Sequence, residues 1–542
     1  MSAPPAARHA SQFRHPVAFW LGVAACAVGV GLHLPMYYSA RSMGYQMNGM
    51  HPDAAMIIGM VAIGAGLATG LYGLMPAGAG AVSQRAARIR VRAMDDAPVN
   101  WRHVALLVAM ALAITIDVMK PTTLSFVTPG MAREYGLKSA ITPHGTLPVA
   151  LLPLCGIGGT VGGSLLWGWL GDRIGRRASI IFAGLLFVTT SICGAMPGFT
   201  WNMLMCFLMG IGAGGMLPIA FALMAETIPA RHRGWLMVLI GGDVAGAYVI
   251  TSWLAGALTP EYSWRILWLI GLPTGLLFIG LNRWIPESPR YLLATGQREE
   301  AAEIMRKFGS EVVPGSDEDE ADASVGTSGL LRVSVTRLPG PSTAIVILAI
   351  GVGFVTYGFQ QWIPTNLQHL GYTSVNSDYI IRNAAVIGLP LTFVVAWMYG
   401  FWSSRKTIIV VCGCTVVSLV WIAAAGNSLA SDHALLTGLL VVPIAGISSA
   451  AAVVTAYAAE IYPTMVRSRG VGLAAGMTKV GGVLIIALVV VSATTPSIAA
   501  TALIGAVPLL AGIIVLGFAR LETRQRPLEE ITQAEFSLSE QA

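Results

Sequence analysis

The sequence predicts an all-α polytopic membrane protein that crosses the bilayer about fourteen times. Of its 542 residues, 55% are hydrophobic and only 11% are charged. The apolar residues fall in runs of roughly 20, the length at which a helix spans about 30 Å of hydrocarbon. Lys and Arg lie between the runs rather than on one soluble face, which argues against nucleic-acid binding. The six cysteines lie inside apolar runs without metal-ligand spacing, so neither disulfides nor a metal site is expected.

The start of the chain is expected to form a separate membrane hairpin. Apolar runs near 17–37 and 54–74 precede a basic segment rich in arginine. The first run follows Arg8 and Arg14 as a signal peptide would, but no small residue stands three places before a cleavage site. We therefore interpret this run as an uncleaved anchor.

Two groups of six spans follow the hairpin. The first group is expected near 104–128, 147–167, 178–197, 202–225, 234–258 and 264–284. The second is expected near 342–363, 379–401, 407–426, 434–457, 470–493 and 497–519. The predicted division is a hairpin with its basic segment (1–100), a six-helix bundle (101–285), a cytoplasmic segment (286–341), a second six-helix bundle (342–520) and a cytoplasmic tail (521–542).

The segment between the two groups begins with helix signals. Ser288 is a suitable N-cap, and Pro289 suits the first helical position. Short amphipathic helices are expected over about 289–294 and 298–308. The acidic run Asp317-Glu318-Asp319-Glu320 then predicts a linker, because it has no apolar face.

The positions of the basic residues predict the orientation. Most of the 33 Lys and Arg fall in alternate connecting segments, which share one side of the membrane. Lys and Arg accumulate in cytoplasmic loops. A multi-pass protein of the plasma (inner) membrane with both termini cytoplasmic is therefore expected.

One short loop between two apolar runs carries a dense motif. Gly168–Arg177 reads GWLGDRIGRR, with three glycines, an acid and basic residues at fixed offsets. This pattern resembles the loop between the second and third helices of major facilitator superfamily transporters. The resemblance implies two six-helix bundles in parallel pseudo-twofold repeat, and here the first hairpin would be additional to them.

A repeated motif supports that resemblance. Ala225-Glu226-Thr227-Ile228-Pro229 with Arg233-Gly234 recurs as Ala459-Glu460-Ile461-Tyr462-Pro463 with Arg469-Gly470. Parallel repeats of six helices are known among such transporters. The resemblance implies a cytoplasmic gate of ion pairs that hold the halves together, formed by Gly168, Asp172, Arg173, Gly175, Arg176, Arg177, Glu226, Arg233, Arg405, Glu460 and Arg469.

Other motifs resemble two transporter families. Pro286-Glu287-Ser288-Pro289-Arg290 and Leu521-Glu522-Thr523 resemble signatures of the sugar porters. Asp117, followed by Phe126-Val127-Thr128-Pro129, and the stretch Thr478-Lys479-Val480-Gly481-Gly482 resemble the aromatic-acid and related metabolite:proton symporters. In that family's pattern a second acid stands where this chain has Lys120.

Four ionisable residues fall inside apolar runs, where such residues are expensive and mark function. We expect Asp117, with Asp243 second, to couple proton movement, and Lys120 and Lys479 to bind substrate. One alternative is that Asp117 and Lys120, three apart on a helix, only neutralise each other. Asp243 and Lys479 occupy equivalent places in the repeat, so a second alternative is a direct pair that closes the empty cavity.

The second half also offers polar and aromatic groups. Gln360, Gln361 and Trp362 stand just before Pro364. We expect them to give hydrogen bonds and an aromatic face to the substrate. The alternative is that they anchor a helix end at the membrane interface, where Trp is favoured.

The sequence therefore predicts proton-coupled symport of a small organic anion or related metabolite by alternating access. A sugar or polyol porter is the nearest alternative, and a transporter-like receptor is an alternative of another class. No catalytic motif indicates an enzyme. The expected partners are a small-molecule substrate, protons and the lipid bilayer, with the proton gradient in place of a cofactor and a monomer as the working unit.

Overall fold

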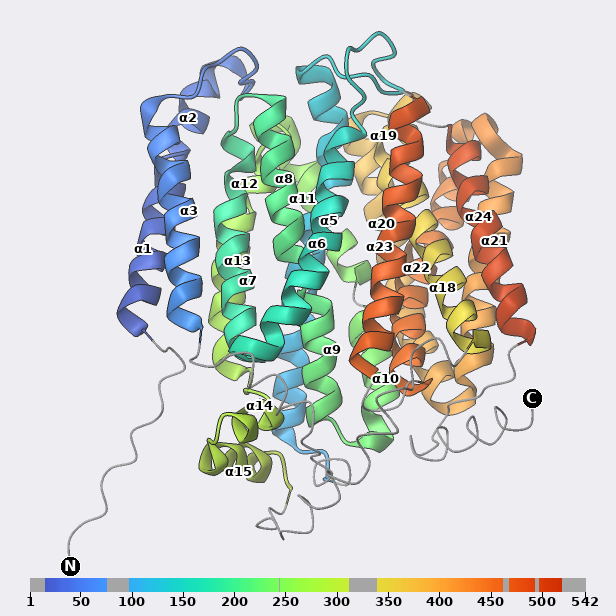
Figure 1. The fold of residues 1–542 in the computed structure, drawn as a ribbon. Helices are drawn as coiled ribbons and strands as arrows, with labels where there is room; N and C mark the ends of the chain where they lie inside the picture. Colours follow the sequence, from blue (N-terminus) through green and yellow to red (C-terminus); the bar gives the residue numbers. More distant parts are fainter. Residues whose placement is uncertain are drawn as a thin grey trace, which may run out of the picture.

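The computed structural model describes residues 15–75, 97–242, 244–310, 339–461, 467–492 and 497–518. The regular secondary structure of the described chain is helical, apart from one isolated bridge between Lys138 and Pro148. Its long helices run side by side, with the hairpin at one edge, α21 and α24 at the other, and α5 and α23 near the middle (Figure 1). Within the described residues, twelve segments are long and apolar enough to span a membrane. The prediction of an all-α polytopic membrane protein is confirmed.

Two helices form the expected first hairpin. They are α1 (Pro16–Gly31) and α3 (Ala54–Leu74), joined through α2 (Leu34–Ser39). The helices approach closely because glycines line their contact: a Cβ on Gly22 would stand 2.5 Å from the Gly66 carbonyl oxygen. The hairpin packs against α7 (Arg176–Thr190).

The first group of helices builds the part of the molecule next to the hairpin. Asn100 caps its first helix by accepting hydrogen bonds from the backbone N–H groups of Arg102 and His103. Two of its apolar helices, α8 and the stretch Leu151–Ser164 of α6, are shorter than the other spans. In addition to α7, the helices are α5 (Trp101–Glu134), α6 (Leu151–Ile174), α8 (Phe199–Ala213), α9 (Met216–Thr227), α10 (Ala230–Gly241), α11 (Val244–Tyr262), α12 (Ile266–Leu269) and α13 (Gly271–Leu281).

The two short helices expected after the first group are present. They are α14 (Pro289–Ala294) and α15 (Arg298–Lys307), and both lie below the bundle in Figure 1. Ser288 caps α14 as predicted, since its side chain accepts a hydrogen bond from the Tyr291 N–H at 3.3 Å.

The second group differs from the prediction at its first span. The expected continuous helix near 342–363 is α18 (Pro339–Phe354), a π-helical turn (Val355–Phe359), a 3₁₀ turn (Gln360–Trp362) and α19 (Ile363–His369). A break of this kind at membrane depth is tolerated where protein buries it. The other helices are α20 (Ser374–Trp397), α21 (Ser404–Ala425), α22 (His433–Ile461), α23 (Arg467–Ser492) and α24 (Ile498–Phe518).

The two groups meet along matching helices. α11 packs on α20, α6 on α23, and α10 on α22, while α5 contacts α19. Side chains from α5, α6, α23 and the broken helix after α18 are therefore placed near one another between the groups. The predicted central residues lie on these elements.

Candidate functional site

A carboxylate and an ammonium from different helix groups interact at the centre. Asp117, on α5, is only 2% exposed. Lys479 on α23 and Tyr357 in the π-helical turn lie near enough to Asp117 for electrostatic coupling, although Lys479 is beyond ion-pair distance. Within the described residues, the Oδ1 atom of Asp117 has no hydrogen-bond partner. The arrangement places an acid of the first group near a base of the second without a direct ion pair.

Lys479 crosses from its own group into the other. Its Nζ donates to the Gly214 carbonyl at 2.8 Å, to the Thr160 carbonyl at 3.4 Å and to the Ser164 hydroxyl. All three oxygens are uncharged, and no carboxylate in the described part of the chain lies within ion-pair distance of Nζ. The ammonium is held by dipoles rather than by a full counter-charge. An anion that binds beside Lys479 would therefore still be stabilised by its positive charge.

Lys120 is directed away from Asp117. Its Nζ donates to the Phe187 carbonyl at 3.2 Å and lies 5.6 Å from the centre of the Phe187 ring. Phe187 is in the last turn of α7, where carbonyls lack regular partners and attract cations. Gly271 makes room, because a Cβ there would stand 2.2 Å from Nζ. Among the described residues no ion pair joins Asp117 to Lys120, so the structure gives no support to the mutual-neutralisation alternative.

The three residues expected from the broken helix are buried. Gln360, Gln361 and Trp362 are between 0 and 3% exposed, which does not fit interfacial anchoring. The Gln360 amide donates to the carbonyls of Pro443 (3.0 Å) and Ile444 (3.2 Å). These bonds fix the turn on α22.

Donor groups beside that turn remain available. Gln361 accepts a hydrogen bond from the Ser125 hydroxyl of α5 at 3.2 Å, while its Nε2 and the Trp362 Nε1 have no partner among the described residues. Buried donors are normally paired. These two groups could therefore hydrogen-bond a substrate.

The basic turn between α6 and α7 is organised by an acid that the sequence did not single out as a site residue. The Glu287 carboxylate accepts hydrogen bonds from the backbone N–H groups of Arg176 (2.7 Å), Arg177 (3.3 Å) and Ser288 (2.9 Å). It thus caps the positive end of α7. Gly175 has φ +95, and a Cβ there would stand 2.5 Å from Glu287 Oε2. In the sequence, the signal for this contact was Gly175 in one motif and Glu287 in another, more than a hundred residues apart.

Burial raises the pKa of Glu287 from its ordinary 4.5 to about 7, although the backbone hydrogen bonds and Arg176 oppose the shift. The folded protein therefore binds a proton more tightly than the unfolded chain between these pH values, so stability falls as the pH rises through this window.

Glu287→Gln is expected to remove this pH dependence, which amounts to at most about 3 kcal/mol for a shift of this size. Thermal unfolding in detergent between pH 5 and pH 8 measures it, with Glu299→Gln on exposed α15 as the control. Parallel pH profiles for wild type and Glu287→Gln would contradict the assignment.

Other residues of the expected gate lie at the same end of the molecule. Glu460 accepts a hydrogen bond from Tyr399 at 2.7 Å, and a Cβ on Gly234 of the first group would stand 2.5 Å from its Oε1. Glu460 thus contacts both groups. Arg405 donates instead to the Leu516 and Gly517 carbonyls at the end of α24, and no ion pair joins it to Glu460 in the described chain.

The contacts described for three other gate arginines are with residues that precede the second group of helices. The Arg233 guanidinium donates to the Ile228 carbonyl at 3.1 Å, and Arg177 Nε donates to the Asn282 carbonyl at 3.3 Å. The Arg173 carbonyl accepts a hydrogen bond from Tyr291 at 3.4 Å. Asp243, and the side-chain positions of Gly168, Asp172, Glu226 and Arg469, lie outside the described residues, so their roles stay predictions.

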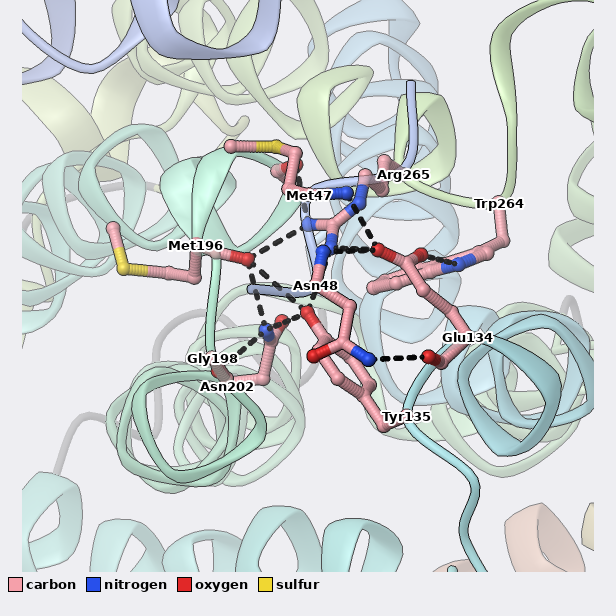
Figure 2. Close-up of polar contacts among 10 residues, drawn as sticks. Met47, Asn48, Glu134, Tyr135, Met196, Gly198, Asn202, Trp264 and Arg265 are labelled. Carbon is pink, nitrogen blue, oxygen red and sulfur yellow. Dashed lines mark hydrogen bonds and ion pairs between the residues drawn. The ribbon is translucent and has the colours of Figure 1, made fainter. Parts of the chain in front are cut away.

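A buried ion pair at the opposite end was also missed. Arg265 donates to Glu134 Oε1 at 2.6 Å, and their side chains are 0 and 3% exposed (Figure 2). Arg265 also donates to the Tyr135 hydroxyl and the Met196 carbonyl, each at 2.7 Å. Trp264 Nε1 donates to Glu134 Oε2 at 2.8 Å. Glu134 lies beyond the expected end of one span and Arg265 at the expected start of another, and pairing between such distant segments leaves no local signal in the sequence.

This ion pair also holds the hairpin. Glu134 Oε1 accepts hydrogen bonds from the backbone N–H groups of Met47 (2.7 Å) and Asn48 (3.2 Å), which follow α2 (Figure 2). The Asn48 side chain donates to the Glu134 carbonyl at 2.8 Å. The outer loop of the hairpin is therefore bound to α5 and α12 through one carboxylate.

The architecture defines a membrane transporter of the major facilitator class. The xylose transporter XylE from E. coli, in a partially occluded inward open conformation, matches 79% of this chain and 100% of its own, with a TM-score of 0.63 and 15% identity. A match at this identity shows the fold. The prediction of a major facilitator fold is therefore confirmed.

The chain belongs to the sugar (and other) transporter family, whose model matches residues 125–534. It is 31% identical to the inner membrane metabolite transport protein YgcS of Escherichia coli, over 68% of this chain and 81% of YgcS. It is 25% identical to the niacin transporter NiaP of Acinetobacter baylyi (72% and 88%) and 26% identical to the 4-hydroxybenzoate transporter PcaK of Pseudomonas putida (71% and 84%). The predicted resemblance to both families is confirmed, as is the prediction of a transporter rather than an enzyme.

Proposed function

We propose that the protein is a proton-coupled symporter that carries a small organic anion by alternating access. The observation that carries this proposal is that Lys479 of the second group donates to carbonyls of the first group near Asp117, which is buried and whose Oδ1 has no partner among the described residues. An anion that binds Lys479 weakens the attraction between that ammonium and the Asp117 carboxylate. Asp117 then takes up a proton more readily, because burial disfavours its charged form once the cation is engaged elsewhere. Substrate and proton binding are linked in this way.

Aromatic carboxylates are the first substrate class to test. Niacin and 4-hydroxybenzoate, named in two relatives, are both carboxylates on an aromatic ring. Tyr357 offers aromatic surface near Asp117, and Gln361 and Trp362 in the adjoining turn offer buried amide and indole donors. A proton-coupled sugar or polyol porter is the second candidate, favoured by the free amide and indole donors of Gln361 and Trp362.

The same proposal covers the arrangement in the membrane. The hairpin of α1 and α3 would be additional to twelve core spans, giving fourteen crossings, with both termini cytoplasmic and a monomer as the working unit. The gate residues around Glu460 and the basic turn would hold the two halves together while the cavity faces outward. Exposed ion pairs of this kind are worth about 0–1 kcal/mol each, which suits a nearly balanced switch.

Uptake into proteoliposomes tests the proposal. Labelled nicotinate, 4-hydroxybenzoate and xylose are offered with and without an inwardly directed proton gradient. The expected result is gradient-dependent accumulation of at least one aromatic anion. Accumulation of xylose alone would favour the sugar porter. Uptake that is independent of the proton gradient would contradict proton coupling.

Asp117→Asn is expected to abolish accumulation driven by a pH gradient while leaving counterflow exchange measurable. The amide keeps the shape of the side chain but cannot take up a proton. Uptake and counterflow are compared with those of Asp432→Asn, which alters an exposed helix cap. Unchanged gradient-driven uptake by Asp117→Asn would show that another residue couples proton movement, and Asp243 would be the first candidate.

A further inference from the structure

A cavity lies between the hairpin and the first helix group. It has a volume of about 230 Å³ and is walled by α1, α7 and α13. Its lining is mainly apolar, with Phe19, Trp20 and Val23 on one wall and Ile181, Leu185 and Ile279 on the others. A wall of this kind suits a hydrocarbon chain.

Two arginines line the same cavity. Arg177 donates from Nε to the Asn282 carbonyl at 3.3 Å, and the Arg283 guanidinium lies 4.2 Å from the ring centre of Trp284. Within the described residues no carboxylate forms an ion pair with either guanidinium. Glu287, the acid on this turn, accepts instead from backbone N–H groups. Two cations beside an apolar cavity therefore present an unneutralised charge.

The cavity lies at the basic end of the bundle. α7 starts at Arg176, and α13 ends at Leu281 just before Arg283. Trp20 is 60% exposed and Trp284 is 50% exposed. Trp side chains of this kind are typical of the boundary between hydrocarbon and head groups. The opening is thus placed where a phospholipid has its phosphate.

We propose that this groove binds one anionic phospholipid, with its phosphate on Arg177 and Arg283 and an acyl chain along Phe19, Val23 and Leu185. Basic pockets between membrane helices on the cytoplasmic side bind anionic head groups. The lipid would fill the space between the hairpin and α7 and fasten them together. Assignment to the cytoplasmic leaflet rests on the orientation proposed above, whereas binding itself does not depend on transport.

Native mass spectrometry of the full-length protein in neutral detergent tests this proposal. Phosphatidylglycerol and phosphatidylcholine with identical acyl chains are titrated in separate experiments, and inorganic phosphate is added as a competitor. We expect one tightly retained phosphatidylglycerol, weaker phosphatidylcholine binding and no displacement by phosphate. Equal retention of both lipids, or full displacement by phosphate, would overturn the lipid assignment.

Variants separate the head-group contact from the acyl-chain contact. Arg177→Gln and Arg283→Gln are each expected to weaken phosphatidylglycerol binding roughly fivefold. This is the loss of affinity expected when one basic residue no longer attracts the anionic head group. Val23→Trp fills the groove and should exclude the lipid although both arginines remain. Arg298→Gln, on exposed α15, is the charge-matched control.

The lipid-binding proposal can be tested even if one of these variants folds poorly. Circular dichroism and a monodisperse elution profile establish folding first, and Arg283→Gln alone carries the test because that side chain is exposed. Wild-type affinity for phosphatidylglycerol in a folded Arg283→Gln protein would contradict the proposal. Since lipid binding is measured without transport, its failure leaves the proposed symport untouched.

Discussion

Arg265→Met is expected to destabilise the protein by about 3–5 kcal/mol, the usual effect of removing one partner from a buried ion pair. The substitution leaves the Glu134 carboxylate buried without its cation, and the Tyr135 hydroxyl and Met196 carbonyl lose a donor. Because Glu134 also binds Met47 and Asn48, the hairpin loop should detach as well. Thermal unfolding in detergent, together with limited proteolysis of the 44–51 loop, measures both effects.

Two variants control that experiment. Arg382→Met removes a half-buried arginine that has no ion-pair partner among the described residues and lies over Tyr379 at 4.5 Å, and it should change stability little. Adding Glu134→Gln to Arg265→Met removes the uncompensated charge, so part of the stability should return. An unfolding temperature of Arg265→Met equal to that of Arg382→Met would show that the ion pair does not stabilise this end of the molecule.

Lys479→Gln is expected to weaken binding of an anionic substrate by about 2–5 kcal/mol, the range for removing one partner of a desolvated charge pair. Glutamine can still donate to Gly214 or Ser164, so the packing between α6 and α23 should persist. The loss is therefore electrostatic, and a neutral ligand should bind almost as before.

Calorimetry in detergent measures this effect with the anion that the uptake screen identifies. Lys406→Gln, which removes a lysine lying 5.7 Å from the Trp402 ring centre, is the control. If Lys479→Gln bound the anion as tightly as wild type, the substrate role of this lysine would be refuted.

The fold was largely predictable because long apolar runs have few alternatives in a membrane. The hairpin, both helix groups and the short helices after Ser288 follow from run length and cap chemistry. The break at Val355–Trp362 was not predictable, since it depends on tertiary bonds such as those of Gln360 to α22. Helix α5 runs on to Glu134, beyond the expected end near 128, because its outer end is stabilised by Arg265 and Trp264.

The site was predictable only as a set of residues. An ionisable residue inside an apolar run is conspicuous, so the sequence singles out Asp117, Lys120 and Lys479 as candidates. Which charges meet depends on the facing helix, so sequence spacing did not show Lys120 bound to the end of α7. Repeat symmetry paired Lys479 with Asp243, whereas within the described residues its charged neighbour is Asp117.

Proton movement caused by the substrate tests the central claim most directly. Proteoliposomes containing the wild-type protein are suspended in weakly buffered medium without any imposed gradient, and a pH electrode records the outside pH when the aromatic anion is added. Symport predicts alkalinisation of the medium as anion and proton enter together, and no response with Asp117→Asn. Uptake of the anion without alkalinisation, or equal alkalinisation with Asp117→Asn, would contradict proton-coupled symport through Asp117.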